Sequence, residues 1–293
     1  MVKKDALYIG IDIGGTKIQL ELFDKQMKCL KKIKIATITK MGQKGLLEEL
    51  YALIDPVFTK AVKGIGVAVP GIVDVRKGNL IKAPHLPNGK SLPLKKLLET
   101  RYKVPVAVDN DVNAFLRSEV HSGKTGKYSN IIAVMVGTGV GGAIIVNGKM
   151  VYGKNGFAGE VGHMVTRHDH KTLRTLEQNT GGSFIPQIAE SLGIKKQMTT
   201  YELEQKTAES AKVMVHLTEQ LGTGLSNLNL IFNPGVFILG GSIYNLFLSS
   251  KKKEMEKIIR ERSLDGSSPR LMDANKKTSV SAGAVLLLRD NKF

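Results

Sequence analysis

The chain has 293 residues, of which 42% are apolar and 24% charged, so a disordered or collagen-like chain is excluded. A single cysteine, Cys29, excludes an internal disulfide and a zinc site built from several thiolates. The formal net charge is +17, but the basic residues are scattered and form no Arg-rich tail. This pattern favours a solvated surface over a polyanion partner.

No apolar run approaches the ~20 residues that a bilayer-spanning helix needs. The first residues also lack the long apolar core and small-residue cleavage site of a signal peptide. With no disulfide framework either, we expect a soluble, cytoplasmic protein without a membrane partner.

The first half of the chain alternates strand and helix patterns. Residues 6–13 are apolar and residues 17–23 alternate apolar with polar, so the glycines between them predict a hairpin. The patterns that follow are a helix at 46–62, a buried strand at 64–69, a helix at 92–102, a strand at 104–108 and a helix at 112–122.

The second half begins with the same pattern about 125 residues later, which suggests two related lobes. A strand at 130–136, a glycine loop at 137–142 and a strand at 143–146 repeat the opening unit. Helices at 182–192 and 201–232, a strand at 236–239 and helices at 243–262 and 281–289 follow. The alternation predicts an α/β fold.

Two glycine loops are candidate phosphate sites. In residues 12–17, backbone N–H groups and the Thr16 hydroxyl could bind phosphate while Asp12 holds Mg²⁺ through water; a simple hairpin turn is the alternative. Residues 137–142 contain the dinucleotide glycine spacing, but a strand follows where that fingerprint requires a helix. We therefore interpret the second loop as a phosphate hairpin.

Two further motifs place carboxylates where chemistry is expected. Asn110 and Asp111 follow a strand and precede a helix, so Asp111 could take a proton from a sugar hydroxyl; a helix cap is the alternative. Glu160 and His163 could both bind sugar hydroxyls, or be an exposed glutamate and a satisfied histidine.

In this order the motifs resemble the ROK family of sugar kinases (repressors, open reading frames and kinases), over essentially the whole chain. They are DIGGTK at 12–17, VPG at 69–71, DNDVNA at 109–114, GTGVGG at 137–142, EVGHM at 160–164, LEQNTGG at 176–182 and ILGGS at 238–242.

The resemblance implies an α/β fold of the two-lobed, actin-like ATPase (ribonuclease H-like) type, with the sugar in a central interdomain cleft. The smaller lobe would take residues 1–111 and the larger lobe 112–280, with a helix near 281–293 packing back on the smaller one. A homodimer is also implied.

The resemblance further implies residue roles in phosphoryl transfer from ATP with Mg²⁺. Asp111 matches the catalytic base acting on the 6-hydroxyl of a hexose. The sugar-binding positions match Asn110, Glu160, His163 and Glu177. The ATP phosphate loops match Asp12, Gly14, Gly15, Thr16 and Lys17, and Gly137, Thr138 and Gly139. Gly240 and Gly241 match the segment near the nucleoside.

The chain departs from the family at its zinc knuckle. Counting back from Glu177, His168 and His170 fall where two cysteines are usual, Thr175 replaces a third, and both knuckle glycines are missing. Either the segment is metal-free, or His163, His168 and His170 bind zinc with a water. The threonine and the lost glycines favour the metal-free alternative.

The sequence therefore predicts an ATP-dependent hexokinase, with glucose as the default substrate. N-acetylglucosamine, N-acetylmannosamine, mannose and fructose stay open as substrates, and polyphosphate stays open as donor. A sugar-responsive repressor is a second class, but the first strand begins near residue 6, which leaves no room for a helix-turn-helix domain. We therefore expect no specific nucleic-acid partner. A non-catalytic sugar-binding relative is a further alternative, against which the presence of Asp111, both glycine loops and Glu160 argues.

Overall fold

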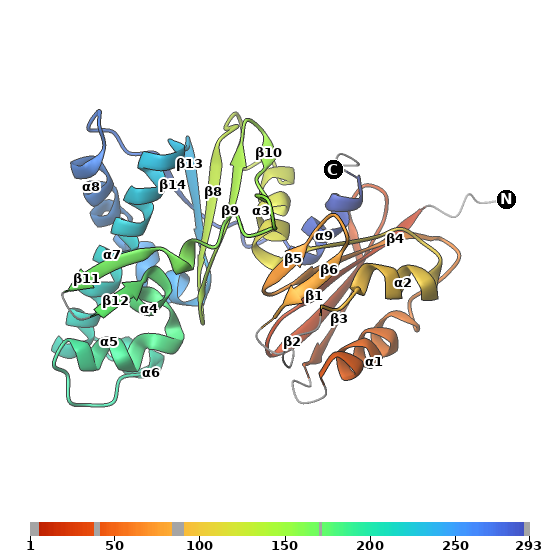
Figure 1. Ribbon diagram of the computed structural model, residues 1–293, viewed down its shortest axis with the longest axis horizontal. Coiled ribbons are helices and arrows are strands. Elements are labelled where there is room, and N and C mark those ends of the chain that lie inside the picture. The colour runs from red at the N-terminus through yellow and green to blue at the C-terminus, as the bar shows by residue number, and fades with distance from the viewer. Residues whose placement is uncertain (1–5, 38–41, 84–90, 170–171, 290–293) are drawn as a thin grey trace. The chain divides into compact units, whose positions relative to one another are not determined.

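The computed structural model describes residues 6–37, 42–83, 91–169 and 172–289, and the chain forms two compact units. Unit 1 comprises the described residues up to Lys124, residues 153–157 and those from Asn275 onward. Unit 2 comprises residues 125–152 and 158–274. Each unit is built on a β-sheet with helices packed against it (Figure 1). The expected α/β class is confirmed.

The sheet of unit 1 has five strands in the order β3-β2-β1-β4-β7. They are β1 (Leu7–Ile13), β2 (Lys17–Phe23), β3 (Cys29–Ala36), β4 (Val62–Val69) and β7 (Val106–Asn110). β1, β2 and β3 form an antiparallel meander, while β4 and β7 run parallel to β1. The carboxyl ends of β1, β4 and β7 therefore meet at one edge.

The sheet of unit 2 repeats this topology in the order β10-β9-β8-β13-β14. Its strands are β8 (Ile131–Val136), β9 (Val140–Val146), β10 (Lys149–Met150), β13 (Val236–Gly240) and β14 (Arg270–Asp273). The first three are again an antiparallel meander, and β13 and β14 again run parallel to the first strand. The strand–glycine–strand pattern seen twice in the sequence is thus the start of each half of a topological repeat.

Each unit has its own helices. Unit 1 contains α1 (Gly42–Ile54), α2 (Leu94–Tyr102), α3 (Asp111–His121), α9 (Val280–Arg289) and a small hairpin of β5 (Ile72–Asp74) and β6 (Asn79–Lys82). Unit 2 contains α4 (Leu176–Thr180), α5 (Ile185–Ser191), α6 (Thr200–Glu204), α7 (Ala208–Phe232), α8 (Lys252–Arg262) and a hairpin of β11 (Val165–Asp169) and β12 (Thr172–Thr175). None of the helices in the described ranges is long and apolar enough to cross a membrane.

The two faces of the unit 1 sheet are packed differently. One face places Ile9 and Ile11 in a core with Leu50 of α1 and Leu98 of α2. On the other face glycines let backbones touch: a Cβ on Gly66 would lie 2.3 Å from the carbonyl oxygen of Ala284 in α9. A Cβ on Gly283 would lie 1.7 Å from the carbonyl oxygen of Ala114 in α3. This close approach sets α9 directly against both the sheet and α3.

The core of unit 2 includes an unusual buried histidine on α7. His216 is 6% exposed, and its Nε2 has no hydrogen-bond partner among the described residues. Burial, together with the nearby Arg167 and Arg174, lowers the pKa of His216 to about 4. The two arginines are cross-strand partners on β11 and β12.

We expect the stability of unit 2 to fall on mild acidification. Between pH 6.5 and about 4 the unfolded chain binds the proton that folded His216 excludes, so the free energy of unfolding decreases by about 2–3 kcal/mol as pH falls. Amide exchange in α7 measures this loss, which His216→Leu should reduce. His121 is exposed, so His121→Leu is the control. If stability depends on pH in His216→Leu as it does in wild type, His216 does not cause the loss.

Candidate functional site

The first predicted loop is the β1–β2 hairpin, and it is held from outside by Thr37. The Gly14 N–H donates to the Lys17 carbonyl (2.8 Å), as a tight turn requires. Thr37 donates its Oγ1–H to the Gly14 carbonyl (2.9 Å) and its N–H to the Thr16 carbonyl (3.0 Å). The sequence pattern assigned no role to Thr37, which is distant in the chain from this loop.

Asp12, the last polar residue of β1 before the turn, carries a strongly perturbed carboxyl. Burial raises its pKa from 3.8 to about 6, with Lys17 acting in the opposite direction. The ionised form of this buried carboxyl lacks solvation, so its oxygens are well suited to bind a divalent cation. Its charge would then be compensated by the metal.

Asp12 and the DNDVNA motif lie on one face at one sheet edge. Asp12 pairs in register with Ala68 of β4, and Ala68 pairs with Asp109 of β7. The three residues therefore form a row across parallel strands, near their carboxyl ends. The structure thus brings together the two predicted motifs of unit 1.

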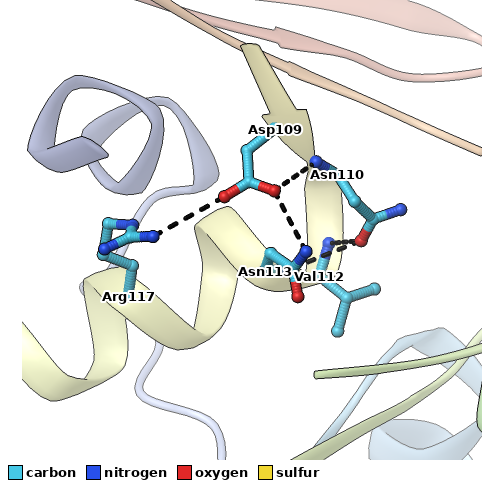
Figure 2. A network of polar contacts seen from close by, with 5 residues as sticks. All are labelled: Asp109, Asn110, Val112, Asn113 and Arg117. Carbon is cyan, nitrogen blue, oxygen red and sulfur yellow. Dashed lines mark hydrogen bonds and ion pairs between the residues drawn. The ribbon is translucent and has the colours of Figure 1, made fainter. Parts of the chain in front are cut away.

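Asn110 ends β7 and caps α3, as Figure 2 shows. Its Oδ1 accepts from the backbone N–H groups of Val112 (2.8 Å) and Asn113 (3.3 Å). Its Nδ2 donates to the Gly71 carbonyl (3.0 Å), which joins the DNDVNA and VPG motifs. The helix cap considered from the sequence is therefore present.

Asp111 is the first residue of α3 and is partly exposed. Its Oδ1 accepts from the Val112 N–H at 3.0 Å. The positive end of the helix dipole favours a negative charge at this position.

Asp109 is completely buried beneath this turn and was given no role by the sequence pattern. Its Oδ1 accepts from the Asn110 N–H (2.8 Å) and from Asn113 Nδ2 (3.0 Å). Its Oδ2 lies 3.7 Å from a terminal nitrogen of Arg117 (Figure 2). Because Asp109 lies on β7, before α3 begins, no helical i, i+4 spacing in the sequence marks this network.

In unit 2 the second glycine loop is bound to the LEQNTGG segment. The Gly182 N–H donates to the Gly137 carbonyl (2.8 Å), and the Ser183 N–H to the Thr138 carbonyl (3.0 Å). Glu177 Oε2 accepts from the Val140 N–H (2.8 Å). Two motifs about 40 residues apart in the chain thus form one structure.

The remaining unit 2 motifs pack against the same loop. A Cβ on Gly241, whose φ is +95°, would lie 2.3 Å from the Val136 carbonyl oxygen, so this turn at the end of β13 requires glycine. A Cβ on Gly162 would lie 2.3 Å from the Val140 carbonyl oxygen. Gly240, Gly241 and the EVGHM segment therefore lie beside residues 137–142.

Glu160 and His163 have accessible side chains. Glu160 precedes a short 3₁₀ turn (Val161–His163) that His163 ends, and Glu160 Oε2 lies 3.5 Å from His163 Nδ1. Their side chains are 40% and 75% exposed, so both can reach a ligand in solution.

The ROK family model matches residues 8–290. The chain belongs to the ROK family. Among its relatives, a putative xylose repressor of Caldicellulosiruptor sp. (strain Rt8B.4) is 30% identical, over 89% of this chain and 71% of the relative. A glucokinase of Halalkalibacterium halodurans is 27% identical, over 97% and 95%. An N-acetyl-D-glucosamine kinase of Vibrio cholerae is 29% identical, over 86% and 90%.

Solved ROK structures share the fold. A ROK glucokinase from Streptomyces griseus in complex with glucose and AMPPNP has a TM-score of 0.79 and 25% identity, covering 98% of this chain and all of that one. The family's two-lobed, actin-like ATPase fold, expected from the motifs, is confirmed.

At the position of the ROK zinc knuckle the chain forms the β11–β12 hairpin. His168 is exposed opposite Leu173, and His170 lies outside the described residues. In the part of the chain that the structure describes, no three His, Cys, Asp or Glu side chains are grouped as metal ligands. Thr175 and Gln178 instead form a capping box on α4, and Asn179 Nδ2 donates to Thr166 Oγ1 (3.1 Å).

We expect Gly139→Ala to displace Glu177. The new Cβ would lie 2.4 Å from Glu177 Oε2, so this flexible side chain must move and release the Val140 N–H. Amide exchange at Val140 should accelerate at least about tenfold while the fold is kept. The nearest described atom beyond its chain neighbours to a Cβ on Gly137 is Ser242 Oγ at 3.5 Å, so Gly137→Ala is the control for this exchange measurement. Equal exchange in both variants contradicts the contact.

Proposed function

We propose that this ROK protein is an ATP-dependent hexose kinase that phosphorylates the sugar 6-hydroxyl, with Asp111 as the general base. The observation that carries the proposal is the placement of Asp111. It is the first residue of α3, its backbone is fixed by the Asn110 cap, and its carboxylate is partly exposed. Asp12 and the first glycine loop share its sheet edge, so a base and a phosphate loop occur together in unit 1.

The reaction is an in-line displacement. The Asp111 carboxylate takes the hydroxyl proton as that oxygen bonds to the γ-phosphorus, and the bond from phosphorus to the ADP oxygen breaks. Backbone N–H groups of residues 14–17 and 137–139 would offset charge on the phosphates. Mg²⁺, when bound, supplies further charge neutralisation, and Asp12 would hold it through water.

The sugar would be held by Asn110, Glu160, His163 and Glu177. Glu160 and His163 support this role through their exposure. Glu177 Oε2 accepts a hydrogen bond from the Val140 N–H, while Glu177 Oε1 accepts none from the described residues. Carboxylate and imidazole groups of this kind bind hydroxyls well.

The substrate and donor are tested in one experiment. A coupled ADP-release assay with Mg-ATP is run across glucose, mannose, fructose, N-acetylglucosamine and N-acetylmannosamine, with polyphosphate as donor in parallel. We propose glucose as the default, because a glucokinase relative is matched over 95% of its length. Turnover with a hexosamine corrects the substrate, and turnover only with polyphosphate corrects the donor. No turnover and no sugar binding refutes the proposal.

A sugar-responsive regulator is the second candidate, favoured by the 30% identity to a putative xylose repressor and by the +17 charge. Sequence-specific DNA binding at physiological salt, relieved by a sugar, would support it. We also propose a homodimer, which light scattering in solution tests.

A further inference from the structure

We propose that Asp109 is a positioning residue: its buried charge, held by Arg117, fixes the turn that presents Asp111 and Asn110. The inference rests on the proposed function, in which Asp111 is the base. Asp109 itself is completely buried and is not assigned any contact with substrate.

Burying a carboxylate at this position destabilises the fold unless other groups compensate its charge. Asp109 is 0% exposed, and burial of an ionised carboxylate costs several kcal/mol unless charge and hydrogen bonds compensate it. The apolar side chains that cluster on this face are the small Ala68, Ala114 and Ala284. A small apolar residue would therefore satisfy the packing at this position. What the carboxylate adds is a set of hydrogen bonds and an ion pair that an apolar residue could not form.

Those bonds form a closed ring around the start of α3. The Asn110 N–H and Asn113 Nδ2 both donate to Asp109 Oδ1. The Asn113 N–H in turn donates to Asn110 Oδ1. Asp111 lies between Asn110 and Asn113 in the chain, so its Cα is held from the residue before it and from the residue two positions after it.

Arg117 supplies the compensating charge from two turns further along α3. Its terminal nitrogen is 3.7 Å from Asp109 Oδ2, and its side chain is only 13% exposed. An ion pair that is shielded from water in this way acts more strongly than a surface pair. The pair ties the second turn of α3 to the end of β7.

The expected consequence is on catalytic geometry, because misplacing a reacting group by about 1 Å can cost on the order of 10²-fold in rate. Asp109→Asn keeps the shape but sets an amide N–H₂ against the guanidinium. We expect kcat to fall about tenfold or more, while KM for Mg-ATP stays within about threefold. Arg117→Met should act in the same direction, and the double variant should be no worse than the poorer single variant.

Glu119 provides a matched control on the same helix. It is also 0% exposed, and its Oε1 accepts from the Asn275 N–H (2.9 Å) and Thr278 Oγ1 (2.5 Å), away from the start of α3. Glu119→Gln should lower stability without lowering kcat. If it lowers kcat as much as Asp109→Asn does, the effect is one of stability and the positioning role is wrong.

A second measurement does not depend on activity. The Val112 and Asn113 amides donate to the Asn110 cap, so their hydrogen exchange should accelerate about tenfold in Asp109→Asn and in Arg117→Met, but not in Glu119→Gln. Unchanged exchange, or wild-type kcat in Asp109→Asn, overturns the inference while leaving the kinase proposal intact. A wild type inactive on every sugar refutes the kinase proposal, and the exchange result still decides whether Asp109 fixes the turn.

Discussion

Asp111→Asn should lower kcat with the preferred sugar by about 10²–10⁴-fold, the range that loss of a general base produces. The asparagine Oδ1 can still accept the Val112 N–H that Asp111 accepts at 3.0 Å, so the start of α3 is kept. An amide cannot take the hydroxyl proton, so only the chemical step is affected. The coupled ADP-release assay measures the loss.

Binding measurements separate this effect from damage to the site. Calorimetry should give affinities for sugar and Mg-ATP within about threefold of wild type, because no binding contact is deleted. Asp55→Asn serves as the activity control, because it removes only an exposed ion pair with Arg101. If Asp111→Asn retains kcat within about threefold, Asp111 is not the base.

The central strands and the edge strand β7 could be predicted from the sequence, whereas the edge strands β3, β10 and β14 could not. β1, β4, β8 and β13 are apolar runs bounded by glycine or proline, and burial on both faces explains those runs. β3 is mostly exposed, with lysines along it, and lies at the edge of its sheet beside β2. β14 has four residues at the other sheet's edge. Such edges form because a neighbour pairs with them, which no local pattern shows.

The predicted helix at 46–62 runs too far and the predicted helix at 201–232 is interrupted, in both cases for identifiable backbone reasons. The apolar spacing over 46–62 continues past Ile54, where α1 ends, because Pro56 disfavours helix at the residue before it. The prediction over 201–232 is split between α6 and α7. Lys206 there adopts a φ of +52°, and Thr207 begins the next helix by capping Ser210.

The candidate site was predictable as a set of motifs but not as a set of contacts. The glycine loops, Asn110 and Asp111 were identified from residue type and position. The bond from Glu177 to the Val140 N–H spans 37 residues, so it follows from the fold alone. Asp109 was overlooked because a buried ion pair cannot be distinguished from a surface one by sequence.

Asp12→Asn should stabilise unit 1 at pH 7 while removing kinase activity. Because burial raises the folded-state pKa of Asp12 from 3.8 to about 6, the folded protein binds more protons than the unfolded chain between these values. Stability therefore falls as pH rises through this window. Above it the ionised carboxylate costs about 2–3 kcal/mol, which a neutral amide avoids.

Amide exchange in β1 measures this gain at pH 7, and the difference between variant and wild type should shrink below about 1 kcal/mol at pH 4, where Asp12 is protonated in the folded state. The exposed Glu48→Gln should change stability by no more than about 0.5 kcal/mol at either pH. Mg-ATP should stabilise the wild type more than Asp12→Asn, because the bound cation compensates the charge that the fold alone does not. If Asp12→Asn is less stable than wild type at pH 7, the charge of the buried carboxylate is already compensated within the protein. Asp12 would then not be the residue that holds Mg²⁺.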